Sequence, residues 1–184
     1  MKDALDVHRT LLEHETAHRI IQLRRQVATA DELPEMLGVP KRCCLIVRMY
    51  ETDGWLAALI VHAGRVPSAP AVAAATAARK IIPASTDLVN TVTGYAAGLV
   101  SPVLLPSSVR VLIDQRVVNG SGTHDEVYTA TGGSGTALCI RAVDLFACSG
   151  ARPVVASVPV PSQATRPPLP LQRSGRAPPE PHLR

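Results

Sequence analysis

The chain has 184 residues and a formal net charge of +4, and 46% of its residues are hydrophobic while only 3% are aromatic. This length suits a single domain, and the shortage of aromatic side chains excludes a nucleic-acid surface built on base stacking. A broad electrostatic footprint is excluded as well, because residues 160–184 carry a net +3 and leave only +1 for residues 1–159.

The chain is predicted to begin with a helix, a strand and a second helix. Apolar residues at helical spacing indicate a helix within residues 5–15, and the apolar run after it indicates a strand within residues 17–27. Thr29 followed by Glu32 fits a capping box at the start of the second helix. Gly38 suits the left-handed position that ends such a helix.

A β-hairpin and an alanine-rich helix are predicted next. Two apolar runs, residues 43–50 and 55–63, flank Asp53 and Gly54, a dipeptide typical of tight hairpin turns. The alanine-rich segment 68–80 then predicts a helix.

The rest of the chain mixes helices and strands without regular alternation. A helix is predicted from Ser85, as its N-cap, to Gly94. Three strands, a helix and a last strand follow, at residues 109–114, 125–132, 136–140, 142–151 and 153–158. This order indicates an α+β fold with a mixed sheet.

The composition changes near the end of the chain. Seven of the sixteen prolines fall within residues 160–184, where few residues could pack in a core. We therefore expect a globular domain at residues 1–159 and a disordered Pro/Arg-rich tail at residues 160–184.

Residues 93–102, TGYAAGLVSP, resemble the GYxxGxxSP loop of the YbaK family, the free-standing relatives of the editing domain of bacterial prolyl-tRNA synthetases. The likeness extends in the family's order over residues 5–157, including TADELPEMLGVP, LAALIVHAGRV, VRVLID and TATGGSGTALCIRAVDLFACSGA. It implies a mixed, barrel-like β-sheet flanked by helices. It also implies a deacylase that hydrolyses the ester of a mischarged aminoacyl-tRNA in trans, at the acceptor end and without a cofactor.

The resemblance implies a site along this loop. Glycines let a backbone approach a ligand closely, and prolines hold successive N–H groups in place. Gly98 and the backbone of Ser101 would take part in catalysis, because positioning and oxyanion stabilisation can suffice for an activated ester. The substrate-binding residues would be Thr93, Gly94, Tyr95, Leu99, Val100, Pro102, Asp114, Gly132 and Cys139.

The sequence departs from the family at two positions of this implied site. The family's lysine, early in the strand after the second helix, aligns with Cys43, and Cys139 stands where many relatives carry an aspartate. Lys41, two residues earlier on the same face of the expected strand, could supply a displaced ammonium about 7 Å away. Cys43 itself is either a nucleophile beside Lys41 and Arg42 or a small core residue.

Three further positions leave alternatives open. Asp114 either caps the next turn or orients a ligand, and Tyr95 lines a pocket with its hydroxyl toward a ligand or a backbone carbonyl. Gly132, Gly133 and Gly135 favour a β-turn over a phosphate loop, because no Lys-Ser/Thr pair follows them. The lost lysine also leaves a rival function, a non-catalytic relative that binds aminoacyl-tRNA or a small amino-acid ligand.

The cysteines and the N-terminal sequence indicate in which cellular compartment the protein is expected. Cys43, Cys44, Cys139 and Cys148 form no CxxC pair and have no metal-like spacing to histidine, so we expect reduced thiols and no metal. No apolar run reaches the roughly 20 residues that cross a bilayer, and no signal core opens the chain. We expect a cytoplasmic protein with no DNA or membrane partner, and the sequence leaves the oligomeric state undetermined.

Overall fold

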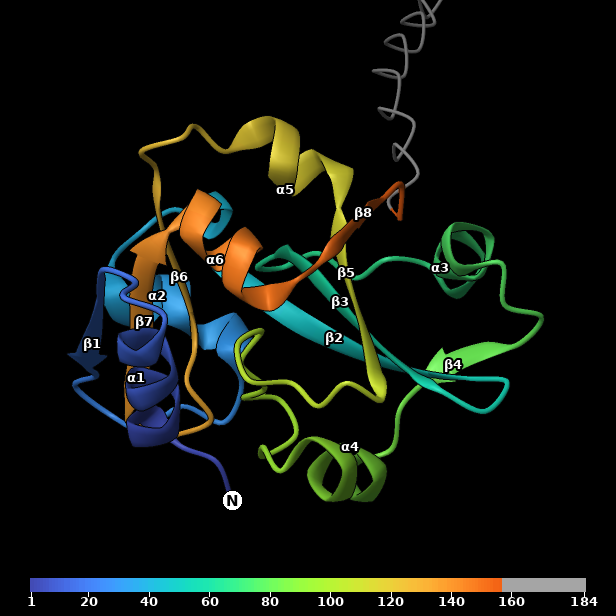
Figure 1. Ribbon diagram of the computed structural model, residues 1–184, viewed down its shortest axis with the longest axis horizontal. Coiled ribbons are helices and arrows are strands. Elements are labelled where there is room, and N and C mark those ends of the chain that lie inside the picture. Colours follow the sequence, from blue (N-terminus) through green and yellow to red (C-terminus); the bar gives the residue numbers. More distant parts are fainter. Residues whose placement is uncertain (157–184) are drawn as a thin grey trace, which may run out of the picture.

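The computed structural model describes residues 1–156, which form two β-sheets surrounded by helices (Figure 1). The helices are α1 (Ala4–Glu13), α2 (Leu33–Leu37), α3 (Ala69–Thr76), α4 (Thr86–Thr93), α5 (Gln115–Gly120) and α6 (Ala142–Ser149), with short 3-10 helices η1 (Ala30–Glu32) and η2 (Lys41–Cys43). The strands are β1 (His18–Gln22), β2 (Leu45–Thr52), β3 (Leu56–His62), β4 (Ile81–Pro83), β5 (Val109–Asp114), β6 (Glu126–Ala130), β7 (Thr136–Arg141) and β8 (Arg152–Val154). The predicted tail at residues 160–184 lies outside the described residues.

The strands form a mixed arrangement. One sheet has three antiparallel strands in the order β1-β7-β6, and the other has five strands in the order β4-β2-β3-β5-β8. In the larger sheet β2 and β3 form the predicted antiparallel hairpin, whereas β3, β5 and β8 run parallel. The α+β prediction is confirmed.

The prediction of a barrel-like sheet is wrong in one respect, because the strands of residues 1–156 form two separate sheets and do not close into a barrel. Within residues 1–156 a single isolated bridge, Cys44 to Tyr128, joins the two sheets. The edge strands β4 and β8 have three residues each and contain Pro83 and Pro153. Proline has no N–H to donate to a further strand, so each of these strands ends the sheet instead of extending it.

Local signals predicted most element boundaries correctly. The capping box of Thr29 and Glu32 is present, and Gly38 ends α2 in the left-handed conformation at φ +66°. Ser85 caps α4 by accepting a hydrogen bond from the Leu88 N–H. Two elements were missed: β4, which is three residues long, and α5, whose N-cap is Asp114.

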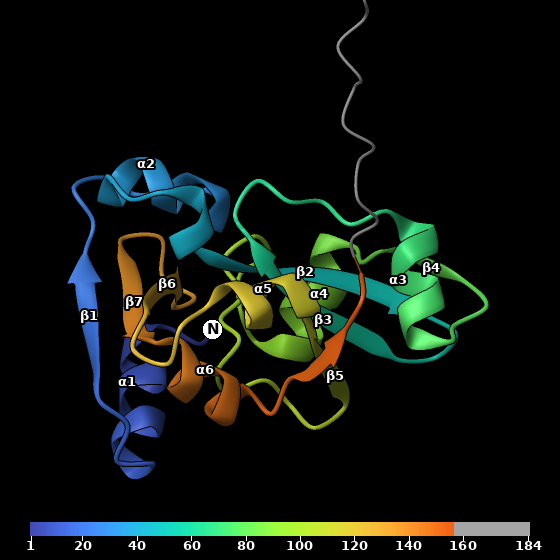
Figure 2. The same ribbon diagram turned by 90° about the horizontal axis from the view of Figure 1, so that it is seen from above.

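Both faces of the three-stranded sheet are buried. Leu138 and Ile140 of β7 point into a cluster with residues of α1 and α6, while Ala137 points into a second cluster with Leu33 of α2. This alternation follows from the period of two along a strand. Figure 2 shows α2 on one side of this sheet and α1 and α6 on the other.

Candidate functional site

The loop predicted to form the site begins where α4 ends. Gly94 closes this helix in the left-handed conformation at φ +73°. The Thr93 hydroxyl donates to the Val89 carbonyl and accepts from the Tyr95 N–H at 3.0 Å. Thr93 is buried, so its side chain fixes the direction in which the loop leaves the helix.

Tyr95 is a fully buried residue that holds the loop together. Its hydroxyl donates to the Val103 carbonyl at 2.8 Å, the second of the two orientations expected for it. Burial raises the pKa of this phenol well above its ordinary value, so it stays protonated and able to donate. The bond closes residues 95–103 into a fixed loop.

The middle of the loop lies against the segment that precedes α2. Gly98 is exposed, has φ +86°, and its carbonyl accepts the Ala30 N–H at 2.8 Å. A β-carbon at Gly98 would lie 3.2 Å from the Ala28 carbonyl oxygen and 3.3 Å from Thr29 Cγ2. Glycine is therefore required here both for its conformation and for the close approach of two backbones.

The backbone N–H groups of this loop fall into two sets. Those of Ala97, Leu99 and Val103 are engaged, by Asn90 Oδ1, the Ala96 carbonyl and the Ser101 hydroxyl, respectively. The N–H groups of Gly98, Val100 and Ser101 have no hydrogen-bond partner among residues 1–156. Buried N–H groups are nearly always paired in folded proteins, so the two buried amides of Val100 and Ser101 call for an acceptor.

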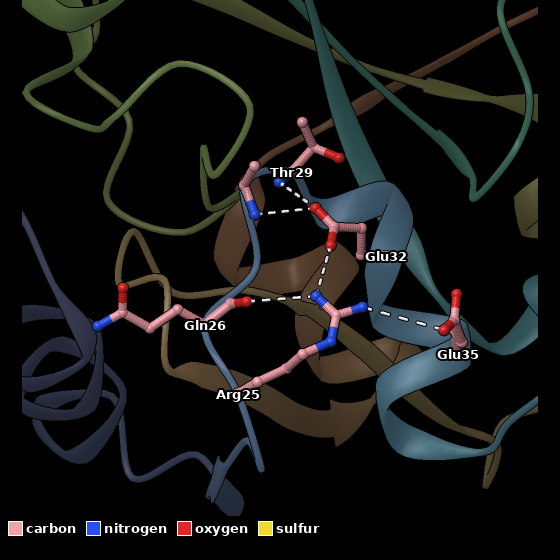
Figure 3. A network of polar contacts seen from close by, with 6 residues as sticks. Arg25, Gln26, Thr29, Glu32 and Glu35 are labelled. Atoms are coloured by element: carbon pink, nitrogen blue, oxygen red, sulfur yellow. Dashed lines mark hydrogen bonds and ion pairs between the residues drawn. The ribbon is translucent and has the colours of Figure 1, made fainter.

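The segment that supports Gly98 is held by the polar network drawn in Figure 3. Glu32 Oε1 accepts the N–H groups of Ala28 at 2.8 Å and Thr29 at 3.1 Å, and Arg25 donates to Glu32 Oε2 at 3.0 Å. These hydrogen bonds lower the pKa of Glu32, with the Thr29 N–H as the largest cause and then the Ala28 N–H and Arg25. Sequence identified the capping box but not its contact with the loop.

We expect this network to make the stability of the protein dependent on pH. Because the pKa of Glu32 is lowered in the folded state, its contribution is present above the unfolded value of about 4.3 and is lost as the pH falls through the folded value. Glu32→Gln should therefore lower the Tm at neutral pH, and this difference should shrink below about pH 4.

The matched control is Glu35→Gln. Glu35 is 80% exposed and lies 3.9 Å from Arg25, so this variant makes the same charge change without touching the N–H groups of Ala28 and Thr29. Thermal unfolding of the three proteins across this pH range is the measurement. Equal Tm losses in both variants would contradict the role of Glu32.

The structure corrects the prediction that Lys41 and Cys43 share one face of a strand. Residues Lys41–Cys43 form η2, because Pro40 precedes them with φ −60° and its carbonyl accepts the Cys43 N–H. The Lys41 side chain instead passes over the turn after β3, where a β-carbon built at Gly64 would lie 3.4 Å from Lys41 Nζ. The fold therefore does not place the Lys41 ammonium beside Cys43 on one face of a strand.

Cys43 lines a small polar cavity. The cavity has a volume of about 210 Å³, and its lining residues are Arg42, Cys43, Gly120, Ser121, Asp125, Glu126 and Val127. No residue of the 93–106 loop lines it. The structure thus brings Gly98, Leu99, Val100 and Ser101 together but places Cys43 at a separate cavity.

Cys139 is buried in β7 beneath an ion pair. The Arg19 guanidinium donates to Cys139 Sγ at 3.2 Å and to both carboxylate oxygens of Glu126 at 2.8 Å. Burial raises the pKa of the Cys139 thiol despite the nearby Arg19, and burial raises the pKa of Cys44 to about 12. Both thiols are therefore neutral, and neither is a thiolate nucleophile.

Asp114 and Gly132 have structural roles, and Pro102 is buried. Asp114 caps α5, because its carboxylate accepts the Arg116 N–H at 3.1 Å, as the capping alternative predicted. Gly132 lies in the turn between β6 and β7, at φ +94°. Its position beneath Lys2 and Tyr95 leaves no room for a ligand there.

Metal sites and membrane-spanning helices are the two remaining features to consider. Among residues 1–156 there is no group of three or more His, Cys, Asp or Glu side chains arranged to hold a metal ion. In the same part of the chain no helix is both long and apolar enough to span a membrane.

Comparisons with known proteins agree with the fold. A search of curated proteins finds no significant match. Among solved structures, a candidate trans-editing enzyme for prolyl tRNA synthetase matches at TM-score 0.69 and 18% identity, over 82% of this chain and 93% of that one. Hypothetical protein APE2540 matches at TM-score 0.71 and 19% identity, over 80% and 97%. Residues 24–148 match the family model of the aminoacyl-tRNA editing domain, and the chain therefore belongs to this family.

Proposed function

We propose that this protein hydrolyses the ester that joins a wrong amino acid to tRNA, acting in trans on the free aminoacyl-tRNA. The observation that carries the proposal is the set of N–H groups of Gly98, Val100 and Ser101, which have no partner among residues 1–156. An ester carbonyl that is attacked by water gains negative charge on its oxygen. Fixed N–H donors directed at that oxygen stabilise the transition state and need no reorganisation.

The proposed roles of the loop follow from its contacts. Tyr95 and Thr93 fix its two ends, and the Ala30 N–H holds the Gly98 carbonyl. The three donors are thus held in position before substrate binds, which is the condition for catalysis by orientation. An aminoacyl ester is already activated, so water can serve as the nucleophile without a serine or cysteine. Ser101 agrees with this, because its hydroxyl accepts the Val103 N–H and is fully buried.

A specific observation supports a second candidate, a non-catalytic protein that binds aminoacyl-tRNA or a small amino-acid ligand. The resemblance expects a lysine where Cys43 stands, and the nearby ammonium of Lys41 lies over Gly64. The site therefore lacks the cation that the family's pattern would place beside the substrate.

Release of amino acid from mischarged tRNAs tests the first candidate against the second. The full chain is incubated with tRNAs that carry alanine, cysteine or serine. These amino acids have small side chains, and they are chosen because the loop itself consists largely of small residues. Turnover of one ester above the rate without protein supports the deacylase. Uniform inactivity of the folded protein, together with retained binding of a non-hydrolysable aminoacyl-adenosine, supports the binding protein.

The variant Cys43→Lys probes the departure from the family. If the bound ester reaches the Cys43 cavity, the added ammonium should raise hydrolysis on the order of ten-fold or more, because it would stabilise a forming oxyanion. If the ester contacts only the loop, hydrolysis should stay unchanged, because no residue of the loop lines this cavity. Cys43→Ser is the control, since it removes the thiol and adds no charge. A loss of activity in Cys43→Ser would instead identify Cys43 as a nucleophile.

A further inference from the structure

Five basic residues belong to segments that come together near the end of the larger sheet where β3 and β5 finish. Parallel strands end at the same edge, so the segments that follow them lie close together. We call this set the basic surface, and its members are Lys41 and Arg42 in η2, Arg65 after β3, Arg116 in the first turn of α5 and Arg152 at the start of β8. Figure 1 shows α5, β5 and β8 together at this end.

The contacts around His62, the last residue of β3, show how closely these segments approach. Backbone groups of Arg42 and Arg116 and the charges of Asp114 and Arg65 all act on its ring, although its Nδ1 forms no hydrogen bond within residues 1–156. Burial is the largest cause that lowers the pKa of His62, so the ring adds no charge at neutral pH. The Lys41 side chain crosses the same turn over Gly64, the neighbour of Arg65.

The cations of the basic surface form no ion pair within residues 1–156. Within residues 1–156, Arg19, Arg25, Arg48 and Arg141 form ion pairs, but none of the five side chains of the basic surface does. Acidic residues do lie nearby. Asp114 is buried, caps α5 and also acts on the His62 ring, while Glu126 is paired with Arg19 and Asp31 with Arg48. Asp125, at the rim of the Cys43 cavity, accepts the Gly122 N–H. Four of the five cations are exposed, and Arg116 is partly exposed.

We propose that the basic surface binds the backbone phosphates of the tRNA acceptor end, and this inference rests on the proposed function. Lysine and arginine neutralise phosphates and release counterions, which gives binding that depends on salt and not on base sequence. Asp31 accepts the Gly64 N–H, and its neighbour Ala30 donates to the Gly98 carbonyl, so the turn that carries Arg65 lies near the candidate loop. Five charges suit a short duplex end better than a long helix.

Binding of uncharged tRNA to the full chain tests this directly, because no ester is present. Arg65→Glu combined with Arg116→Glu should weaken binding about ten-fold or more at moderate salt, and the slope of log K against log salt should fall by roughly one for each phosphate that is no longer neutralised. The matched control combines Arg9→Glu with Arg24→Glu, two exposed arginines outside the basic surface that give the same change in net charge. It should change the affinity less than about two-fold.

A charge-conserving pair, Arg65→Lys with Arg116→Lys, guards against misfolding and should keep most of the affinity. Equal weakening by the two Glu pairs would overturn the proposal, since binding would then follow net charge alone. Absence of any binding by the folded parent protein would overturn it as well. Failure of the proposed function has a different signature, namely tRNA binding with the expected variant pattern but no release of amino acid.

Discussion

Gly132→Ala should lower the free energy of unfolding by roughly 3 to 5 kcal/mol, a large part of the total stability of an ordinary domain. A β-carbon at Gly132 would lie 2.5 Å from the Lys2 carbonyl oxygen and 2.6 Å from Tyr95 Cδ1. Gly132 also has φ +94°, which side-chain-bearing residues rarely adopt. The two costs add, because neither can be relieved by moving a flexible side chain.

Each neighbour of Gly132 is held by further contacts. The Tyr95 ring is fully buried and its hydroxyl is bonded to Val103, so it cannot turn aside. The Lys2 backbone could move only by breaking its N–H bond to the Gly94 carbonyl at 2.7 Å and the bond from Lys2 Nζ to the Leu104 carbonyl at 2.7 Å. Relief of the clash would therefore dismantle both ends of the candidate loop.

Gly38→Ala is the control for this prediction. Gly38 has φ +66°, but no atom would lie within 4 Å of its β-carbon. This substitution costs only the backbone strain, about 1 kcal/mol. Denaturant unfolding of the two variants and the parent gives the free energies of unfolding directly. Equal losses of stability in Gly38→Ala and Gly132→Ala would show that packing against Lys2 and Tyr95 contributes nothing.

The parts of the fold that were predicted correctly depend on neighbours in the sequence. The capping box of Thr29 and Glu32, the end of α2 at Gly38 and the turn between β2 and β3 all require residues within a few positions of one another. The resemblance at residues 93–102 identified the loop for the same reason, because its glycines and its proline lie close together in the sequence.

The parts that sequence did not predict depend on distant residues. Lys2, Tyr95 and Gly132 meet only in the fold, and no local pattern predicts their contact. The basic surface likewise combines cations from four segments. A count of net charge along the chain does not reveal it, because the acidic residues between these segments cancel the positive charges. The strand expected at Cys43 became η2 because Pro40 sets the backbone before an apolar run that otherwise resembles the start of a strand.

Gly98→Ala should reduce ester hydrolysis on the order of 100-fold and cost roughly 1 to 2 kcal/mol of stability. The added methyl group would meet the Ala28 carbonyl oxygen at 3.2 Å and Thr29 Cγ2 at 3.3 Å, and Glu32 holds the N–H groups of Ala28 and Thr29. The supporting segment cannot withdraw, so the loop must move. A shift of this kind changes the directions of the N–H groups of Gly98, Val100 and Ser101, the donors proposed to stabilise the oxyanion.

Two measurements separate this effect from a general loss of stability. Gly150→Ala places alanine at φ +59° with no atom within 4 Å, and it should lower stability about as much while keeping hydrolysis within about two-fold. Binding of a non-hydrolysable aminoacyl-adenosine to Gly98→Ala should weaken as well. If Gly98→Ala binds and hydrolyses like the parent protein, the loop is not the site. The chemistry must then be sought at the Cys43 cavity, because Cys44 and Cys139 are buried neutral thiols and Asp114 is committed to α5.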